Sequence, residues 1–94
     1  MKKVLFETHH LYYWPNFRPI IDEMILRKNY DIEVSMPRRG LNIEHSILNN
    51  ECTKLSIPFI TAETESERIN KIRKKVFDIV IVGNVGKLNT IVND

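Results

Sequence analysis

Two adjacent histidines, His9 and His10, follow a short apolar run and are the first residues of this chain suited to chemistry. An imidazole titrates near neutral pH, so either ring can accept a proton from a reacting hydroxyl or contact an anionic group. We predict that one of the pair is catalytic; a capping or packing role in the loop is the alternative. Neighbours on an extended loop do not readily face one metal ion, and no Cys, His or Asp partner stands at ligand spacing. The remaining histidine, His45, is predicted on the outer face of the second helix, so no metal site is predicted.

Aromatic side chains crowd the next stretch, at Tyr12, Tyr13 and Trp14. Such rings stack on a sugar or a base, or hold a partner surface. Together with Arg18, they are predicted to contact a substrate. The alternative is that the three rings pack down as a lid over the core.

A second candidate segment, residues 83–87, looks like a fragment of a phosphate-binding loop. It is not a P-loop, because no Gly occupies the first motif position and Leu88 stands where the motif has the Ser or Thr that holds magnesium. Successive backbone N–H groups can still bind an anion there. We therefore predict substrate contacts from Asn84, Gly86 and Lys87.

Arg38, at the end of the second predicted strand, is the remaining predicted substrate contact, because a guanidinium pairs well with phosphate. A solvated turn is the alternative. The first loop lacks G-x-G-x-x-G and the second strand does not end in an acidic residue, so a classical NAD-binding fold is not predicted and no cofactor is expected. The basic run at 71–75 ends a helix, where cations suit the dipole, so nucleic acid is not a predicted partner.

Four short β-rich runs alternate with three segments of helical period, and these elements must position the candidates. Asn16 can cap the first helix, which carries Pro19 in its first turn, and Thr64 with Glu67 forms a capping box for the third. The predicted strands are residues 3–7, 31–36, 57–61 and 77–82, and the first two predicted helices are residues 17–28 and 43–55. The predicted inward side chains include Phe17, Ile20, Ile21, Met24, Ile43, Ile47, Leu48, Cys52, Leu55, Ile69, Ile72 and Val76.

This βαβαβαβ alternation predicts a three-layer Rossmann-like α/β domain with a four-stranded parallel sheet in the order 3-2-1-4. The strand at 77–82, the most apolar segment, is predicted to be central and buried. The crevice of such a sheet opens where the strand order reverses, beyond Glu7 and Val82. Residues 9–14 and 84–87 are therefore predicted to face each other across one crevice.

The composition indicates one globular domain, residues 1–94, with 43% hydrophobic and 28% charged residues. The net charge of +2 is too small to indicate nucleic acid by itself. No apolar stretch approaches the roughly 20 residues that span a bilayer, and the start lacks a signal peptide. Together with the single cysteine, Cys52, these features predict a cytoplasmic protein without a transmembrane segment.

A family resemblance is carried by residues 3–6, the loop with His9 and His10, residues 17–24 and residues 77–84. The opening resembles the first βα unit of the two-domain GT-B glycosyltransferase scaffold. It is most similar to the CDP-glycerol glycerophosphotransferases of teichoic-acid synthesis. The resemblance implies that the chain is the front part of a GT-B amino-terminal domain, in an enzyme of cell-envelope biosynthesis.

What the resemblance implies is the acceptor side of a transferase that moves a glycosyl or glycerophosphoryl group from a nucleotide-activated donor to a glycan or polyol-phosphate acceptor. A second domain would hold most of the donor and could bring the enzyme to the inner face of the membrane, so the chain alone is expected to be inactive. His9 or His10 would be the base or phosphate contact.

The alternative is a non-catalytic Rossmann-like binding or interaction module, or one subunit of a split enzyme. The edge of the predicted sheet beside the strand at 77–82 has no neighbour within the sequence. Unpaired strand edges favour association. We therefore expect a homo-oligomer, or a second domain or subunit that covers this edge.

Overall fold

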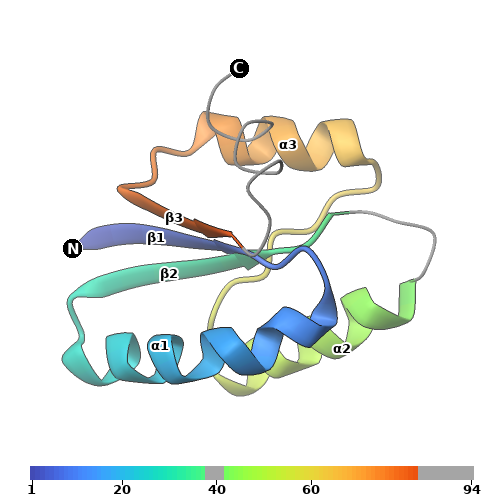
Figure 1. The fold of residues 1–94 in the computed structure, drawn as a ribbon. Coiled ribbons are helices and arrows are strands. Elements are labelled where there is room, and N and C mark those ends of the chain that lie inside the picture. The colour runs from blue at the N-terminus through green and yellow to red at the C-terminus, as the bar shows by residue number, and fades with distance from the viewer. Residues whose placement is uncertain (38–41, 83–94) are drawn as a thin grey trace.

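The structure is a computed structural model and describes residues 1–37 and 42–82. Figure 1 shows three layers, with helices α1 and α2 on one face of a sheet and α3 on the other. The elements in chain order are β1 (Lys2–Glu7), the 3-10 helix η1 (Leu11–Tyr13), α1 (Trp14–Arg27), β2 (Tyr30–Ser35), α2 (Asn42–Lys54), α3 (Glu65–Lys74) and β3 (Ile79–Val82).

The sheet is parallel, as predicted, and its strand order is β2-β1-β3. Val4 in β1 lies opposite Ile32 of β2 and Ile79 of β3. Successive side chains of β1 face opposite layers: Phe6 packs with the α1 and α2 side, and Leu5 packs with the α3 side. The alternation of strands and helices along the sequence therefore gave the correct class of fold.

The prediction of a four-stranded sheet in the order 3-2-1-4 is wrong, because the described residues form three strands. Residues 57–61 run beside β2 but make only an isolated bridge, between Phe59 and Val34. The Val34 N–H donates to the Pro58 carbonyl at 3.0 Å, and the Ile60 N–H donates to the Val34 carbonyl at 2.9 Å. To extend this pairing toward the start of β2, residue 58 would have to donate its N–H to the next carbonyl of that strand. Pro58 has no N–H, so the parallel ladder does not continue.

The segment predicted to be the central strand, 77–82, is shortened to β3 and lies at the edge of the described sheet. Its side chains are not fully covered, since Ile79 is 36% exposed and Val80 and Ile81 are half-buried. The central strand is β1 because it pairs with a neighbour on both sides. An uninterrupted apolar run therefore did not identify the most buried strand.

Two apolar clusters fill the spaces between the layers. The smaller one lies on the α3 side of the sheet, around Leu5, Ile60 and Ile72. The larger one lies on the α1 and α2 side and consists of Val4, Phe6, Trp14, Phe17, Ile21, Ile32, Val34, Met36, Leu48, Cys52 and Ile57. Burial in this cluster raises the pKa of the Cys52 thiol to about 12, so the thiol stays protonated in the folded protein.

Four side chains predicted to face the core are exposed instead, by 43%, 64%, 42% and 79% respectively: Ile20, Ile43, Ile47 and Val76. Helix α2 buries a narrow stripe that includes Leu48 and Cys52, and the two exposed isoleucines of this helix lie outside it. The exposed valine follows the end of α3, where helical spacing no longer applies.

Helix α1 begins at Trp14 and not at residue 17. Asn16 therefore lies inside the helix and does not cap it, and Pro15 occupies the first turn, where the missing N–H has no helical partner to lose. Pro19, predicted for the first turn, lies further inside the helix. The helix ends where Lys28 adopts a left-handed conformation, with φ of 58°.

The predicted cap of α3 is confirmed, because the Glu67 N–H donates to Thr64 Oγ1 at 3.2 Å. The Glu67 carboxylate accepts from the Glu63 N–H at 3.1 Å. In a standard capping box this second bond comes from the N–H of the cap residue itself. Here it comes from the residue before the cap, and the start of α3 is fixed on both sides of Thr64.

Candidate functional site

Polar side chains are buried where β1 and β2 end. Glu7 ends β1, Ser35 ends β2, and both are 0% exposed, as is Thr8. The Thr8 N–H donates to the Ser35 carbonyl at 2.8 Å, which extends the pairing of the two strands past Glu7. Parallel α/β sheets bind ligands beyond the carboxyl ends of their strands, so these polar groups lie at the edge where a site is expected.

An ion-pair network fixes this edge, and we call its members, Glu7, Ser35, Glu65 and Arg68, the edge cluster. Arg68 comes from α3 and is 1% exposed. Its Nη1 donates to both carboxylate oxygens of Glu7, at 2.8 and 3.0 Å, and its Nε and Nη2 donate to the two oxygens of Glu65, at 2.9 and 2.5 Å. The Ser35 hydroxyl donates to the same Glu7 carboxylate, so both strand ends are tied to α3.

The charge of Arg68 is paired with carboxylates of the protein itself. Burial acts to lower the pKa of Arg68, but the hydrogen bonds and charges of Glu65 and Glu7 outweigh it and hold the pKa above its ordinary value. Removing one partner of such a buried pair costs about 3–5 kcal/mol, because the other charge is left buried and unpaired. The edge cluster thus braces the strand ends and does not present a free cation to a ligand.

Sequence reasoning did not predict the edge cluster. Glu7 and Arg68 are 61 positions apart. Arg68 lies in a helix rich in charged residues, where an arginine is expected to be solvated. One signal was available: Glu7 directly follows three apolar strand residues, and a carboxylate that is buried needs a partner. Nothing in the sequence names that partner.

The predicted catalytic pair lies just past this edge, within a series of ring contacts. The His9 and His10 rings meet edge to face with centroids 4.4 Å apart, and His10 stacks on Tyr12 at 5.1 Å. Tyr12 contacts Tyr13 at 4.5 Å, and Tyr13 contacts Phe17 of the core at 6.4 Å. His9 is 8% exposed, whereas His10 is half-buried and Tyr12 is 65% exposed. His10 is therefore the more accessible histidine of the pair.

A hydrogen bond just after the histidines holds their loop in place. The Leu11 N–H donates to Glu44 Oε1 at 3.1 Å, which ties the loop to the first turn of α2. Thr8 Oγ1 is buried and has no hydrogen-bond partner among residues 1–37 and 42–82. The loop is thus anchored at Leu11, and the Thr8 hydroxyl is covered within the protein near the sheet edge.

The other predicted substrate contacts lie in different places. Trp14 is 5% exposed and belongs to the larger core cluster. Arg18 lies between α1 and α2, where its guanidinium is 3.4 Å from the Asp22 carboxylate and 3.7 Å from that of Glu51. Outside the described residues lie Arg38, Asn84, Gly86 and Lys87. The crevice between residues 9–14 and 84–87 therefore stays a prediction.

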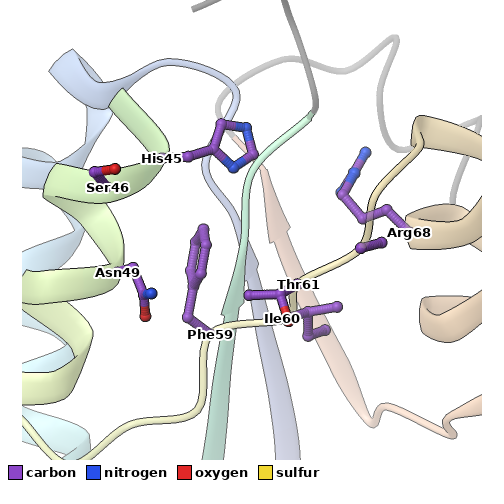
Figure 2. A pocket seen from close by; sticks show the side chains of 8 residues that line it. His45, Ser46, Asn49, Phe59, Ile60, Thr61 and Arg68 are labelled. Atoms are coloured by element: carbon purple, nitrogen blue, oxygen red, sulfur yellow. The ribbon is translucent and has the colours of Figure 1, made fainter. Parts of the chain in front are cut away.

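A second feature that the sequence did not predict is a pocket of about 170 Å³ between α2 and residues 57–61, with Arg68 opposite (Figure 2). We call it the α2 pocket; its lining includes His45, Ser46, Asn49, Phe59, Thr61 and Arg68. The sequence placed His45 on the outer face of its helix. The ring is instead half-buried, its Nε2 lies 2.8 Å from the Pro37 carbonyl, and it meets the Phe59 ring edge-on at 6.0 Å.

Within residues 1–37 and 42–82, no three His, Cys, Asp or Glu side chains are grouped so that they could hold a metal ion. No described helix has both the length and the apolar character needed to cross a membrane.

Comparisons with protein-family models, with curated proteins and with solved structures find no match for this chain. The class that the fold and the site define is therefore a coarse one. The chain contains a small α/β domain with a parallel sheet, and polar side chains gather at the carboxyl ends of its first two strands.

Proposed function

We propose that this chain forms the acceptor side of a transferase that moves a glycosyl or glycerophosphoryl group from a nucleotide-activated donor. The observation that carries the proposal is the gathering of His10, Thr8 and the edge cluster where β1 and β2 end. This is the edge at which parallel α/β domains bind their ligands. The resemblance of residues 3–6 and 17–24 to GT-B transferases supports transfer chemistry among the activities that such a fold can host.

Within this proposal His10, and not His9, is the group that meets the acceptor. His10 is half-buried and its ring is oriented by stacking on Tyr12, whereas His9 is 8% exposed and supports His10 edge-on. A fixed imidazole can take the proton of an attacking hydroxyl, or contact a phosphate oxygen.

Transfer also requires a second wall that holds the donor. Reacting groups must be positioned and shielded from water before a group moves between them. Among the described residues, the buried cation at the sheet edge, Arg68, is already paired with Glu7 and Glu65, so it is poorly placed to hold a nucleotide diphosphate. We therefore assign donor binding to a second domain or subunit.

A non-catalytic binding module is the second candidate, and the same pairing of Arg68 favours it. If the chain only binds a ligand, His10 contributes contact area and no proton transfer. Loss of its ring would then weaken binding by a small factor and would leave no reaction step affected.

The test is a transfer assay of the full-length protein with a panel of nucleotide-activated glycosyl and glycerophosphoryl donors. Losing a catalytic acid or base typically lowers turnover by about 100- to 10,000-fold. The turnover of His10→Ala should therefore fall by that factor, with an unchanged melting temperature. His9→Ala, the matched variant, should mainly lower the melting temperature, because His9 is buried. Full activity of His10→Ala would contradict the catalytic assignment, and no transfer with any donor would favour the binding module.

A further inference from the structure

The α2 pocket presents hydrogen-bonding groups that the other described residues leave unused. Figure 2 shows His45, Ser46 and Asn49 on α2 on one side, with Phe59 and Thr61 of the extended segment beside them. Ser46, Asn49 and Thr61 are exposed, and among the described residues their side chains make no hydrogen bond. Two hydroxyls and a carboxamide therefore surround one hollow, and each can both donate and accept.

The electrostatics of the pocket favour a neutral ligand. Among the described lining residues the one permanent charge is that of Arg68, which Glu7 and Glu65 engage. The His45 Nε2 lies 2.8 Å from the Pro37 carbonyl, which only accepts, so Nε2 carries a proton and is engaged there. Among the described residues of this lining, a phosphate or carboxylate would find no unpaired Lys or Arg side chain. A ligand with hydroxyl groups matches donors and acceptors of this kind.

The size of the pocket and its aromatic wall further restrict which ligands fit. A cavity of about 150 Å³ holds a benzene ring, so a pocket of about 170 Å³ takes a ligand of about six heavy atoms, or the edge of a larger one. The half-buried Phe59 ring gives an apolar surface on which the C–H groups of a polyol or sugar can rest. The pocket is also close to the loop that holds His9 and His10. Glu44, next to His45 in α2, accepts a hydrogen bond from the Leu11 N–H at the end of that loop.

We propose that the α2 pocket binds a hydroxylated, uncharged ligand moiety, a small polyol or the hydroxyl edge of a sugar. Ser46, Asn49 and Thr61 hydrogen-bond its hydroxyl groups, and Phe59 packs against its carbon atoms. Its role as the acceptor subsite rests on the function proposed above, but the binding itself does not. Binding can therefore be measured without any donor.

The experiment is an NMR titration of the ¹⁵N-labelled 94-residue chain with glycerol and with sorbitol. Signals of Asn49 and Thr61 should shift, and 1-propanol, which has the three-carbon chain of glycerol but a single hydroxyl, should shift them much less. Each lost neutral hydrogen bond weakens binding by about two- to tenfold, so Asn49→Ala and Thr61→Val should each bind that much less tightly. Asn50→Ala, on an exposed neighbour outside the pocket, is the matched control and should bind like the wild type.

Three outcomes overturn the proposal: no shift with either polyol, the same affinity in Asn49→Ala as in Asn50→Ala, or stronger binding of inorganic phosphate than of polyol in this pocket. Transfer assays of the same variants in the full-length protein separate the two proposals. An acceptor subsite predicts a raised KM for acceptor in Asn49→Ala with kcat unchanged. Polyol binding in a protein that transfers nothing would support the pocket and count against the transferase.

Discussion

Replacing Arg68 by methionine should destabilise the fold more than almost any other single change on α3. The substitution keeps a long side chain with good helix propensity but leaves the Glu7 carboxylate buried without its cation. Breaking a buried pair in this way costs about 3–5 kcal/mol. A domain of this length has a total stability of about 5–14 kcal/mol, so the loss is a large share of it.

Urea unfolding followed by circular dichroism measures this loss. With a loss of about 4 kcal/mol and an m-value of about 2 kcal/mol per M, the midpoint should fall by about 2 M. Lys74→Met, on an exposed residue of the same helix, is the control and should change stability by less than about 0.5 kcal/mol.

A double variant, Glu7→Leu with Arg68→Met, separates the ion pair from simple packing. It removes both buried charges, so it should be more stable than Arg68→Met alone. If Arg68→Met and Lys74→Met unfold at the same urea concentration, the edge cluster is not a brace. A double variant that loses the sum of both single losses would refute the same reasoning.

Two other predictions concern single side chains. The Cys52 thiol ionises near pH 9.0 when unfolded and near 12 when folded, so the unfolded state loses its proton first and stability should fall as pH rises above 9. The loss of unfolding free energy is at most about 1.4 kcal/mol per pH unit. Cys52→Ala should lack this loss when urea unfolding is compared at pH 8 and pH 10. An equal change of unfolding free energy with pH in the two proteins would contradict the assignment. Thr64→Ala should lower the free energy of unfolding by about 1 kcal/mol through the lost cap, while Thr64→Ser should stay close to the wild type. An alanine variant as stable as the wild type would show that the cap contributes nothing.

The parallel sheet and the α3 cap could be predicted because both depend on local sequence. Strand and helix alternation requires crossover connections, and Thr64 with Glu67 satisfies the first N–H groups of a helix at fixed spacing. Whether residues 57–61 form a fourth strand could not be predicted from the sequence pattern. Residues 57–61 have strand-like composition, but whether the missing N–H of Pro58 matters depends on the neighbour that would have needed it.

Some residues of the candidate site could likewise be predicted from the sequence, and others could not. His9 and His10 were found because they follow a strand, and the structure separates them by burial, which their adjacency in sequence could not show. Arg68 was missed because a charged helix residue is normally solvated, and only the packing of α3 over the ends of β1 and β2 makes it a buried partner of Glu7. His45 was misplaced because its ring reaches Phe59, beyond the reach of helical periodicity.

Chemical rescue by imidazole tests whether the His10 ring takes part in transfer. The turnover of full-length His10→Ala, with saturating donor and acceptor, is measured with and without added imidazole, alongside His9→Ala. The proposal predicts that imidazole restores a substantial part of the activity to His10→Ala and nothing to His9→Ala, because only His10 is accessible enough to be replaced by a free ring. Full activity of His10→Ala without imidazole, or rescue of His9→Ala instead, would contradict it.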